Sequence, residues 1–359
     1  MMSKVDVAIV GGGPAGAAAA ISAAQAGLHV VIFDGEPNEI DRPGETLPPG
    51  TEPLFRRLGV DQAINRAVAI RHDGHWVQRP GSRRFLPFGS DRNGTWLGYQ
   101  IRRNVLRQIL IGRAKEVSVV VRHTRALHPL SQGQTIIGIK TAAESVISRL
   151  VIDASGSSHW LARARGDLIE CASPQLIAWY GWARSRKASD FVRPIFTTNA
   201  AEWSWIAQVD DGLCAWVRLN FGPARAGRLA PPRQLKGFKQ LSRARGADVT
   251  WRIVARQGGE GFLYVGDAAA VLDPASSHGV VRALLTGMAA AQHAVRVIRL
   301  RHSDRAGAAA FERWTRAMFF RDARALHALR QPAVSIGRTP YDLSLRINPV
   351  VLSTLGAPR

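Results

Sequence analysis

The stretch that decides the fold lies near the start of the chain, where residues 5–34 read VDVAIVGGGPAGAAAAISAAQAGLHVVIFD. Residues 5–10 are mostly apolar and predict a short buried strand. After a glycine turn, residues 17–26 are rich in helix-forming alanine and end before Gly27, a residue type that commonly terminates helices. Residues 29–34 predict a second strand, so the whole stretch is predicted to be a β-α-β unit.

The glycines of the turn follow the spacing G-x-G-x-x-G between a strand and a helix. The first permits the tight turn, the second lets the backbone approach a pyrophosphate, and the third lets the helix pack closely on the strand. The free N–H groups and the positive dipole end of the helix then face the phosphates, and a carboxylate at the end of the second strand accepts hydrogen bonds from the adenosine ribose. The residues predicted to bind a dinucleotide are Gly11, Gly13, Pro14, Ala15, Gly16 and Asp34.

A second motif lies late in the chain, where GDAA at residues 266–269 follows the apolar strand 262–265. The sequence DPASSHG at 273–279 then opens a long helix. A carboxylate after the strand is placed to bind the hydroxyls of a ribityl chain, and the first N–H groups of the helix are placed to face the pyrimidine end of a flavin. The pair of motifs therefore predicts that the dinucleotide is FAD, with contacts from Asp267, Gly279 and Val280.

The segments between these motifs predict a second kind of structure. Residues 175–221 carry tryptophans in alternating apolar and polar patterns, as expected of an antiparallel sheet, and Trp203-Ser204-Trp205 places both indoles on one face. We therefore predict an α/β fold, a Rossmann-type FAD-binding domain with an inserted antiparallel or mixed β-sheet substrate domain. The predicted boundaries are 1–74, 98–160 and 250–300 for the FAD-binding domain, 75–97 and 161–249 for the substrate domain, and 301–359 for a C-terminal helical segment and tail.

The charge of the chain is strongly basic, with 48 Lys and Arg against 27 Asp and Glu and a formal net charge of +21. Such a charge attracts acidic proteins, nucleic acids or anionic membranes. The basic residues are spread along the chain and no common nucleic-acid-binding motif is present, so we do not expect nucleic acid as a partner. A solvated basic face and a surface for an acidic protein partner remain equal alternatives.

Other classes are disfavoured by what the sequence lacks. No apolar run is long enough to span a bilayer, and the N-terminus lacks the features of a signal peptide, so we expect a cytoplasmic protein. The two cysteines, Cys171 and Cys214, suit neither a disulfide framework nor a metal site, and we expect no metal.

Three elements carry a resemblance to a known superfamily: GGGPAG at 11–16, VIDASG at 151–156 and LYVGDAA at 263–269. They resemble the FAD signatures of the p-hydroxybenzoate-hydroxylase and tryptophan-halogenase superfamily, and the resemblance covers nearly the whole chain. It implies an FAD-dependent monooxygenase. It also implies a cofactor contact from Pro274, and it places Arg103 where such proteins carry a flavin-contacting arginine and Arg42 in a loop where another often lies.

A narrower resemblance rests on RPGETLPP at 42–49 and on DPASSHG at 273–279. Both are similar to flavoproteins that mature peptidyl quinone cofactors. This resemblance implies that a Tyr or Trp side chain is hydroxylated on a partner, the precursor of a quinone-cofactor oxidase or dehydrogenase. Because no second G-x-G-x-x-G is present, we expect the electrons to come from transiently bound NAD(P)H or from a separate flavin reductase.

Two departures argue against halogenation. Flavin halogenases depend on a lysine near the aromatic substrate, usually in the first hundred residues, but here no lysine lies between Lys4 and Lys115. The motif W-x-W-x-I-P is also absent, and the nearest string is WSWIAQ at 203–208.

Two residues are candidates for proton transfer. Glu45 lies in a loop expected to pass the flavin edge and is a candidate base for an indole or phenol, with a surface carboxylate as the equal alternative. His278 precedes the flavin-facing helix and is able to move protons at neutral pH, with a loop-supporting role as the alternative.

Other functions remain open and differ in the shape of site that they require. A protein substrate needs an open cleft over the flavin, whereas a hydroxylase of a small free aromatic needs a closed pocket. A reductase that saturates prenyl chains needs a long apolar tunnel. A non-catalytic flavoprotein chaperone would bind an oxidase precursor without turnover.

Overall fold

The computed structural model describes residues 2–35, 43, 45–185, 191–222, 229–301 and 304–330. Its first sheet has a parallel centre in the order β10-β2-β1-β13, with β23 paired in parallel to the end of β13. This order confirms the Rossmann-type prediction. The bounds are β1 Met2–Val10, β2 Val30–Phe33, β10 Val120–Arg122, β13 Ser145–Asp153 and β23 Phe262–Tyr264.

Antiparallel strands complete this sheet. The hairpin of β11 (His128–Gln132) and β12 (Thr135–Lys140) pairs with the start of β13, and β22 (Gly258–Gly259) pairs with β23. Because β12 and β23 pair with opposite ends of β13, residues more than a hundred positions apart in the sequence lie on one sheet.

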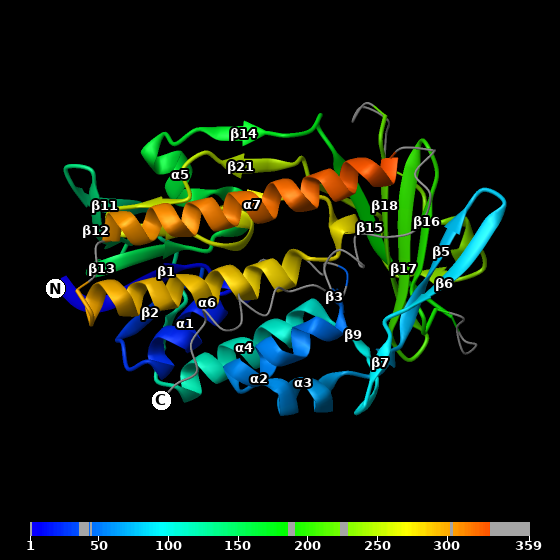
Figure 1. Cartoon of the computed structure of the whole chain (residues 1–359), viewed down its shortest axis with the longest axis horizontal. Helices are drawn as coiled ribbons and strands as arrows, with labels where there is room; N and C mark the ends of the chain where they lie inside the picture. Colours follow the sequence, from blue (N-terminus) through cyan, green and yellow to red (C-terminus); the bar gives the residue numbers. More distant parts are fainter. Residues whose placement is uncertain are drawn as a thin grey trace.

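Helices cover one face of the sheet (Figure 1). Helix α1 (Pro14–Gln25) packs against the strands with a row of fully buried alanines, and α6 (Gly279–Ile298) crosses it closely. At Gly287 of α6 a Cβ would lie less than 3.0 Å from the carbonyl oxygen of Ala15, so only glycine permits this crossing. The other helices on this side are α2 Glu52–Leu58, α3 Asp61–Ala67 and α4 Arg103–Glu116.

The opposite face is covered by short elements. Helix α5 (Trp160–Arg165) and a small sheet in the order β14-β21-β24 pack against it around a buried apolar cluster. These strands are β14 Ile169–Cys171, β21 Arg252–Val254 and β24 Ala270–Val271. The parallel strands are therefore buried on both faces, as their apolar sequences predict.

A second sheet forms one end of the molecule (Figure 1). Its order is β19-β15-β18-β17-β16-β5-β6, with β20 also paired to β15, and it is mixed because β16 and β5 run parallel. Its bounds are β5 Gly74–Arg79, β6 Ser82–Pro87, β15 Ile177–Arg184, β16 Ile195–Thr198, β17 Glu202–Asp210, β18 Leu213–Asn220, β19 Lys239–Gln240 and β20 Arg245–Asp248.

A small sheet joins the two parts of the molecule. Its order is β3-β9-β4, with bounds Glu45–Leu47, Gly98–Ile101 and Ile70–His72. The ribbon of β7 (Ser90–Asp91) and β8 (Gly94–Thr95) precedes β9. Strand β9 leads directly into α4, so the connection between the sheets also sets the start of that helix.

The last described helix, α7 (Asp304–Arg330), runs beside α6 and reaches the second sheet (Figure 1). Phe311 packs in the core under the first sheet, whereas Phe319, Ala323 and Leu326 pack with residues of the second sheet. The segment predicted as a separate C-terminal element therefore contributes to the cores of both parts. The predicted tail, 331–359, lies outside the described residues.

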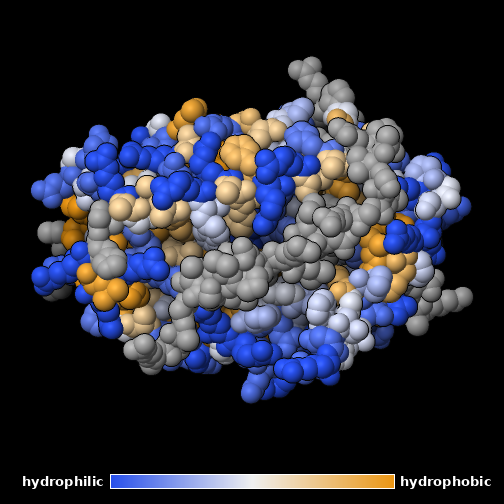
Figure 2. Space-filling model, viewed as in Figure 1, coloured by the Kyte–Doolittle hydropathy of each residue, from blue (hydrophilic) through white to orange (hydrophobic). Residues whose placement is uncertain are grey.

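The surface agrees with the composition. Figure 2 shows a face that is largely hydrophilic, with hydrophobic residues scattered between the polar ones. Within the described ranges, none of the helices combines the length and apolar character needed to cross a membrane.

Candidate functional site

A cavity of about 650 Å³ lies between the glycine turn, the late motif, the second sheet and α7. This volume falls within the range typical of ligand sites, roughly 300–1,000 Å³. Its walls come from segments far apart in the sequence, including Gly13–Ala15, Glu45–Leu47, Arg103, Ala154, Asp267, Val271–Ser277, Gly279 and Val280.

The glycine turn has the shape that a pyrophosphate requires. Gly11 has φ +100°, and a Cβ there would lie less than 3.0 Å from the carbonyl oxygen of Ala154. At Gly16 a Cβ would meet the carbonyl oxygen of Gly11 at a similarly impossible distance. At Gly13, by contrast, a Cβ would meet no atom within 4 Å, so the backbone is open to the cavity beside the start of α1. The turn thus has the backbone geometry expected of a dinucleotide-binding turn, and it fits the phosphates of FAD.

Asp34 stands at the end of β2, beside the turn. Its carboxylate accepts a hydrogen bond of 3.2 Å from the N–H of Gly12 and forms an ion pair with Arg107 of α4. The placement suits recognition of the adenosine ribose. Sequence reasoning did not identify Arg107, although its four-residue spacing from Arg103 places both arginines on one face of α4.

The late motif closes around the other end of the cavity. Asp267 lies in a 3₁₀ turn, Gly266–Ala268, after β23, and Pro274 lies in a second 3₁₀ turn, Pro274–Ser276. Both residues line the cavity together with the first two residues of α6, Gly279 and Val280. A Cβ at Gly279 would meet no atom within 4 Å, so the N-terminus of this helix is also open to the cavity.

Asp273 ties this loop to the second sheet. One carboxylate oxygen accepts a hydrogen bond of 2.9 Å from the N–H of Ala275, and the other accepts one of 3.2 Å from the indole N–H of Trp203. Because Trp203 belongs to β17, its indole links this loop to the second sheet.

Two of the predicted site residues, Glu45 and Arg103, lie side by side in the structure. Glu45 and Arg103 both line the cavity and form an ion pair of 3.4 Å, so the candidate base and the candidate flavin contact are partners. Arg42 lies outside the described residues. His278 is buried, and its Nδ1 lies 3.5 Å from a carboxylate oxygen of Asp322 on α7, so its ring faces the helix packing and does not line the cavity.

The second sheet supplies an aromatic wall. Tyr180, Phe196, Trp203 and Trp205 line the cavity, and Trp205 donates a hydrogen bond of 3.2 Å to the hydroxyl of Thr46. His75 of β5 completes this wall, with its ring centroid 5.9 Å from that of Trp205.

His75 is a candidate that the sequence reasoning missed. Burial lowers the pKa of His75 to about 4, and the nearby His72 acts in the same direction. The imidazole is therefore neutral at pH 7, and because burial disfavours its charged form, it serves the wall as a neutral polar group able to accept a hydrogen bond. An isolated histidine in an alternating strand carries no local signal of such a role, since only the pairing of the sheet brings it to the cavity.

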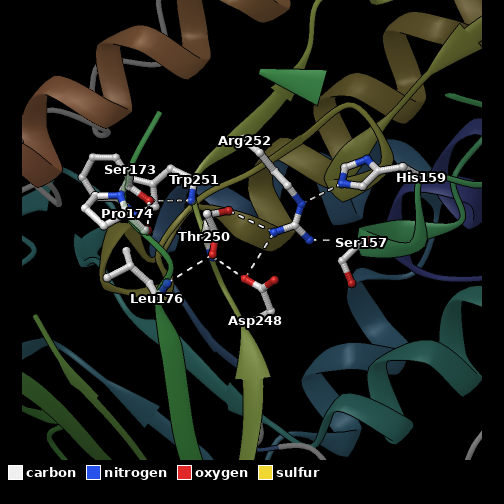
Figure 3. Close-up of polar contacts among 9 residues, drawn as sticks. All are labelled: Ser157, His159, Ser173, Pro174, Leu176, Asp248, Thr250, Trp251 and Arg252. Carbon is white, nitrogen blue, oxygen red and sulfur yellow. Dashed lines mark hydrogen bonds and ion pairs between the residues drawn. The ribbon is translucent and has the colours of Figure 1, made fainter. Parts of the chain in front are cut away.

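A polar network supports the cavity wall near Asp267 (Figure 3). Arg252 donates from Nε to Nε2 of His159 at 2.9 Å and from Nη1 to the carbonyl oxygen of Thr250 at 3.0 Å. Since Nδ1 of His159 lies 3.0 Å from the carbonyl oxygen of Ala268, that nitrogen carries the proton and the ring is neutral. Burial also lowers the pKa of His159. The network thus holds the backbone of Ala268, the residue next to Asp267. Its members come from β21 and from the turn after β13, and no local sequence motif marks them.

The comparisons with known proteins agree with this geometry. A family model for the FAD binding domain matches residues 4–181. Digeranylgeranylglycerophospholipid reductase 1 of Methanopyrus kandleri is 28% identical over 326 residues, covering 82% of this chain and 81% of that protein. The 1H-pyrrole-2-carbonyl-[peptidyl-carrier protein] brominase of Pseudoalteromonas luteoviolacea is 25% identical over 324 residues, covering 80% of this chain and 76% of that protein.

Solved structures show the same fold. The flavin-dependent brominase Bmp2 superposes with a TM-score of 0.82 at 19% identity, covering 98% of this chain and 92% of that one. A geranylgeranyl bacteriochlorophyll reductase-like protein from Thermoplasma acidophilum gives a TM-score of 0.79 at 20% identity, covering 99% of both chains.

The protein is an FAD-dependent oxidoreductase with a Rossmann-type FAD-binding domain. The α/β fold, the cofactor and the broad superfamily resemblance are confirmed. The relatives named above are prenyl-lipid reductases and halogenases, so the narrower resemblance to quinone-cofactor maturation proteins remains a hypothesis.

Proposed function

We propose that this enzyme uses FAD to hydroxylate an aromatic side chain, a Tyr or Trp of a partner protein that is the precursor of a quinone-cofactor oxidase or dehydrogenase. The observation that carries the proposal is the aromatic wall opposite the flavin-binding loop, formed by Tyr180, Phe196, Trp203 and Trp205. Aromatic rings prefer offset or edge-to-face contact with one another, so this wall suits a planar ring placed over the flavin.

When bound and reduced by NAD(P)H or a flavin reductase, FAD would supply two of the electrons for the reaction with O₂; the ring would supply the other two as it takes up one oxygen atom, and the other atom would leave as water. The chain's own residues position the ring and accept its proton. Glu45 of β3, held by Arg103, is the group that accepts a proton from an indole or phenol, and the neutral His75 is placed to accept a hydrogen bond from it.

The net charge of +21 supports a macromolecular partner with acidic character, because such a field speeds the encounter of oppositely charged proteins. Among the described residues that line the cavity there is no lysine, which disfavours a halogenase that depends on one.

Prenyl-chain reduction is the second candidate, and the relatives favour it over the first. Several of them are digeranylgeranylglycerophospholipid reductases that align over about 80% of this chain. The cavity lining also includes three apolar residues of α7, Ala325, Ala328 and Leu329, which suit contact with a hydrocarbon chain.

One experiment separates the two candidates by the mass of the product. The protein is co-expressed with oxidase or dehydrogenase precursors encoded beside its gene, and the precursors are examined by intact mass spectrometry. In parallel, chemically reduced holoenzyme is incubated anaerobically with a prenylated glycerol phospholipid. Gain of one or two oxygen atoms by a precursor, only when this protein is present, supports the proposal.

A gain of two hydrogens per double bond in the lipid, with unchanged precursors, replaces the proposal with the reductase. Oxygenation of a small free aromatic alone identifies a free-substrate hydroxylase. Stable binding of an unmodified precursor identifies a chaperone. As a control within the site, Glu45→Gln is expected to lower oxygenation by about 10²–10⁴-fold if Glu45 accepts the proton, while FAD binding is retained.

A further inference from the structure

A buried charged cluster connects the start of α6 to the middle of α7. His278, Arg282 and Asp322 are only 6%, 7% and 4% exposed. Nδ1 of His278 lies 3.5 Å from Asp322, and Arg321 donates to the same carboxylate at 3.0 and 3.1 Å. Charges so little exposed are retained in proteins when they are paired or when a ligand completes their bonding.

The pairing within the protein is incomplete. Nη1 of Arg282 and Nε2 of His278 are buried and have no hydrogen-bond partner within the described chain, and Oδ2 of Asp322 has only the long contact to His278. Of the three residues, Arg282 lines the cavity. A buried guanidinium N–H without a protein acceptor at a cavity wall points to an acceptor on the molecule that fills the cavity.

The position of Arg282 in α6 indicates which part of that molecule carries the acceptor. Arg282 lies in the first turn of α6, and its N–H donates to the carbonyl oxygen of His278 at 2.8 Å. Gly279 and Val280, which are predicted to contact the pyrimidine end of the flavin, stand in the same turn and line the cavity. The pyrimidine end carries carbonyl oxygens and gains negative charge when FAD is reduced.

We propose that Arg282 donates a hydrogen bond to the pyrimidine end of FAD, and that Asp322 of α7 is a positioning residue that holds His278, whose carbonyl oxygen accepts from the N–H of Arg282. The guanidinium adds a full positive charge to the partial charge of the helix N-terminus. It therefore stabilises reduced FAD more than oxidised FAD and raises the midpoint potential. The proposal rests on FAD binding and does not depend on which substrate is oxidised or reduced.

The charge state of Asp322 agrees with this role. Burial alone would raise the pKa of Asp322, but His278, Arg282 and Arg321 together hold it below its ordinary value. The carboxylate is therefore ionised at neutral pH and able to hold the imidazole of His278 and the guanidinium of Arg321 that contact it. Through Asp322, α7 becomes part of the flavin site, although it lies far along the chain from the nucleotide-binding motifs.

The test measures the cofactor itself. Purified holoenzyme and the variants Arg282→Met, Arg282→Lys and Asp322→Asn are titrated with a chemical reductant, and the midpoint potential is read from the flavin spectrum. The matched control is Arg296→Met, which removes one positive charge from an exposed position in the last turn of the same helix. FAD affinity and thermal unfolding of each apoprotein are measured alongside.

Arg282→Met is expected to reduce the preference for reduced over oxidised FAD by about tenfold, which for a two-electron couple corresponds to about 30 mV in the midpoint potential. Arg282→Lys is expected to retain most of that preference, Asp322→Asn to lose part of it, and Arg296→Met to leave it unchanged.

Three results would overturn the proposal. The first is an unchanged potential in Arg282→Met with FAD bound. The second is an equal shift in Arg296→Met, which would reveal only a long-range effect of charge. The third is a normal potential in Arg282→Met together with weaker binding of a substrate, which would assign the guanidinium to the substrate. If Arg282→Met does not fold, the comparison of Arg282→Lys with Asp322→Asn decides between the same outcomes.

Discussion

Two glycines of the nucleotide-binding turn are expected to give opposite results when each is replaced by alanine. Gly13 has φ −72° and ψ −179°, a conformation open to any residue, and a Cβ there meets no atom within 4 Å. Gly13→Ala is therefore expected to leave the apoprotein unchanged or about 0.4–1 kcal/mol more stable. Gly16 is different, because a Cβ there would clash with the carbonyl oxygen of Gly11 and lie 3.1 Å from the Cβ of Ala154.

The expected magnitudes follow from these contacts. Gly16→Ala overpacks a buried helix–strand contact, which costs about 1–3 kcal/mol of unfolding free energy. Gly13→Ala instead places a methyl group where the pyrophosphate approaches the backbone. One extra carbon in a fitted site costs about 1–3 kcal/mol, or about 10–200-fold in FAD affinity.

The assay combines urea unfolding of the two apoproteins with FAD titration followed by flavin fluorescence. The wild-type apoprotein and holoprotein serve as references for both measurements. The reasoning is refuted if Gly13→Ala destabilises the apoprotein as much as Gly16→Ala does, or if Gly13→Ala binds FAD as tightly as the wild type.

Three further predictions concern the cofactor site, the second sheet and their connection. Asp34→Asn is expected to weaken FAD binding by about 10–100-fold, because a charged hydrogen bond contributes about 1.5–3 kcal/mol. Unchanged affinity in the same titration would show that Asp34 does not bind the adenosine ribose. Burial lowers the pKa values of His72 and His75 from 6.5 to about 4. The unfolded chain therefore binds more protons, and the unfolding free energy should fall by about 3 kcal/mol per histidine as the pH drops from 6.5 to 4. Urea unfolding across that range should show a smaller fall for His75→Phe, and an equal fall would contradict the assignment. Trp203→Phe removes the hydrogen bond to Asp273 and should cost about 1–3 kcal/mol of unfolding free energy, whereas a loss below about 0.5 kcal/mol, typical of surface changes, would show that the bond contributes little.

Much of the nucleotide-binding part was predictable because its signals are local. The spacing of Gly11, Gly13 and Gly16 depends on backbone geometry within a few residues, and Asp34 follows from the length of one β-α-β unit. The late motif was predictable for the same reason, since Asp267 and Gly279 stand at the ends of a strand and a helix whose sequences mark them.

The substrate side was less predictable because its residues meet only through the pairing of strands. His75 comes to the cavity because β5 joins β16 in parallel, and no pattern near His75 indicates that pairing. The ion pair of Glu45 with Arg103 likewise depends on β3 pairing with β9, and the facing of His278 toward Asp322 depends on the path of α7.

The sequence by itself determined the FAD-binding turn, the late flavin motif and the α/β class, because each rests on short-range backbone conformation and on the periodicity of apolar residues. Only the tertiary structure decided what surrounds the flavin. The aromatic wall, the neutral His75 and the link from His278 to Asp322 arise from burial and from contacts between distant segments. Burial changes the charge state of a side chain and removes its bonding partners, and neither effect is visible until the chain is folded.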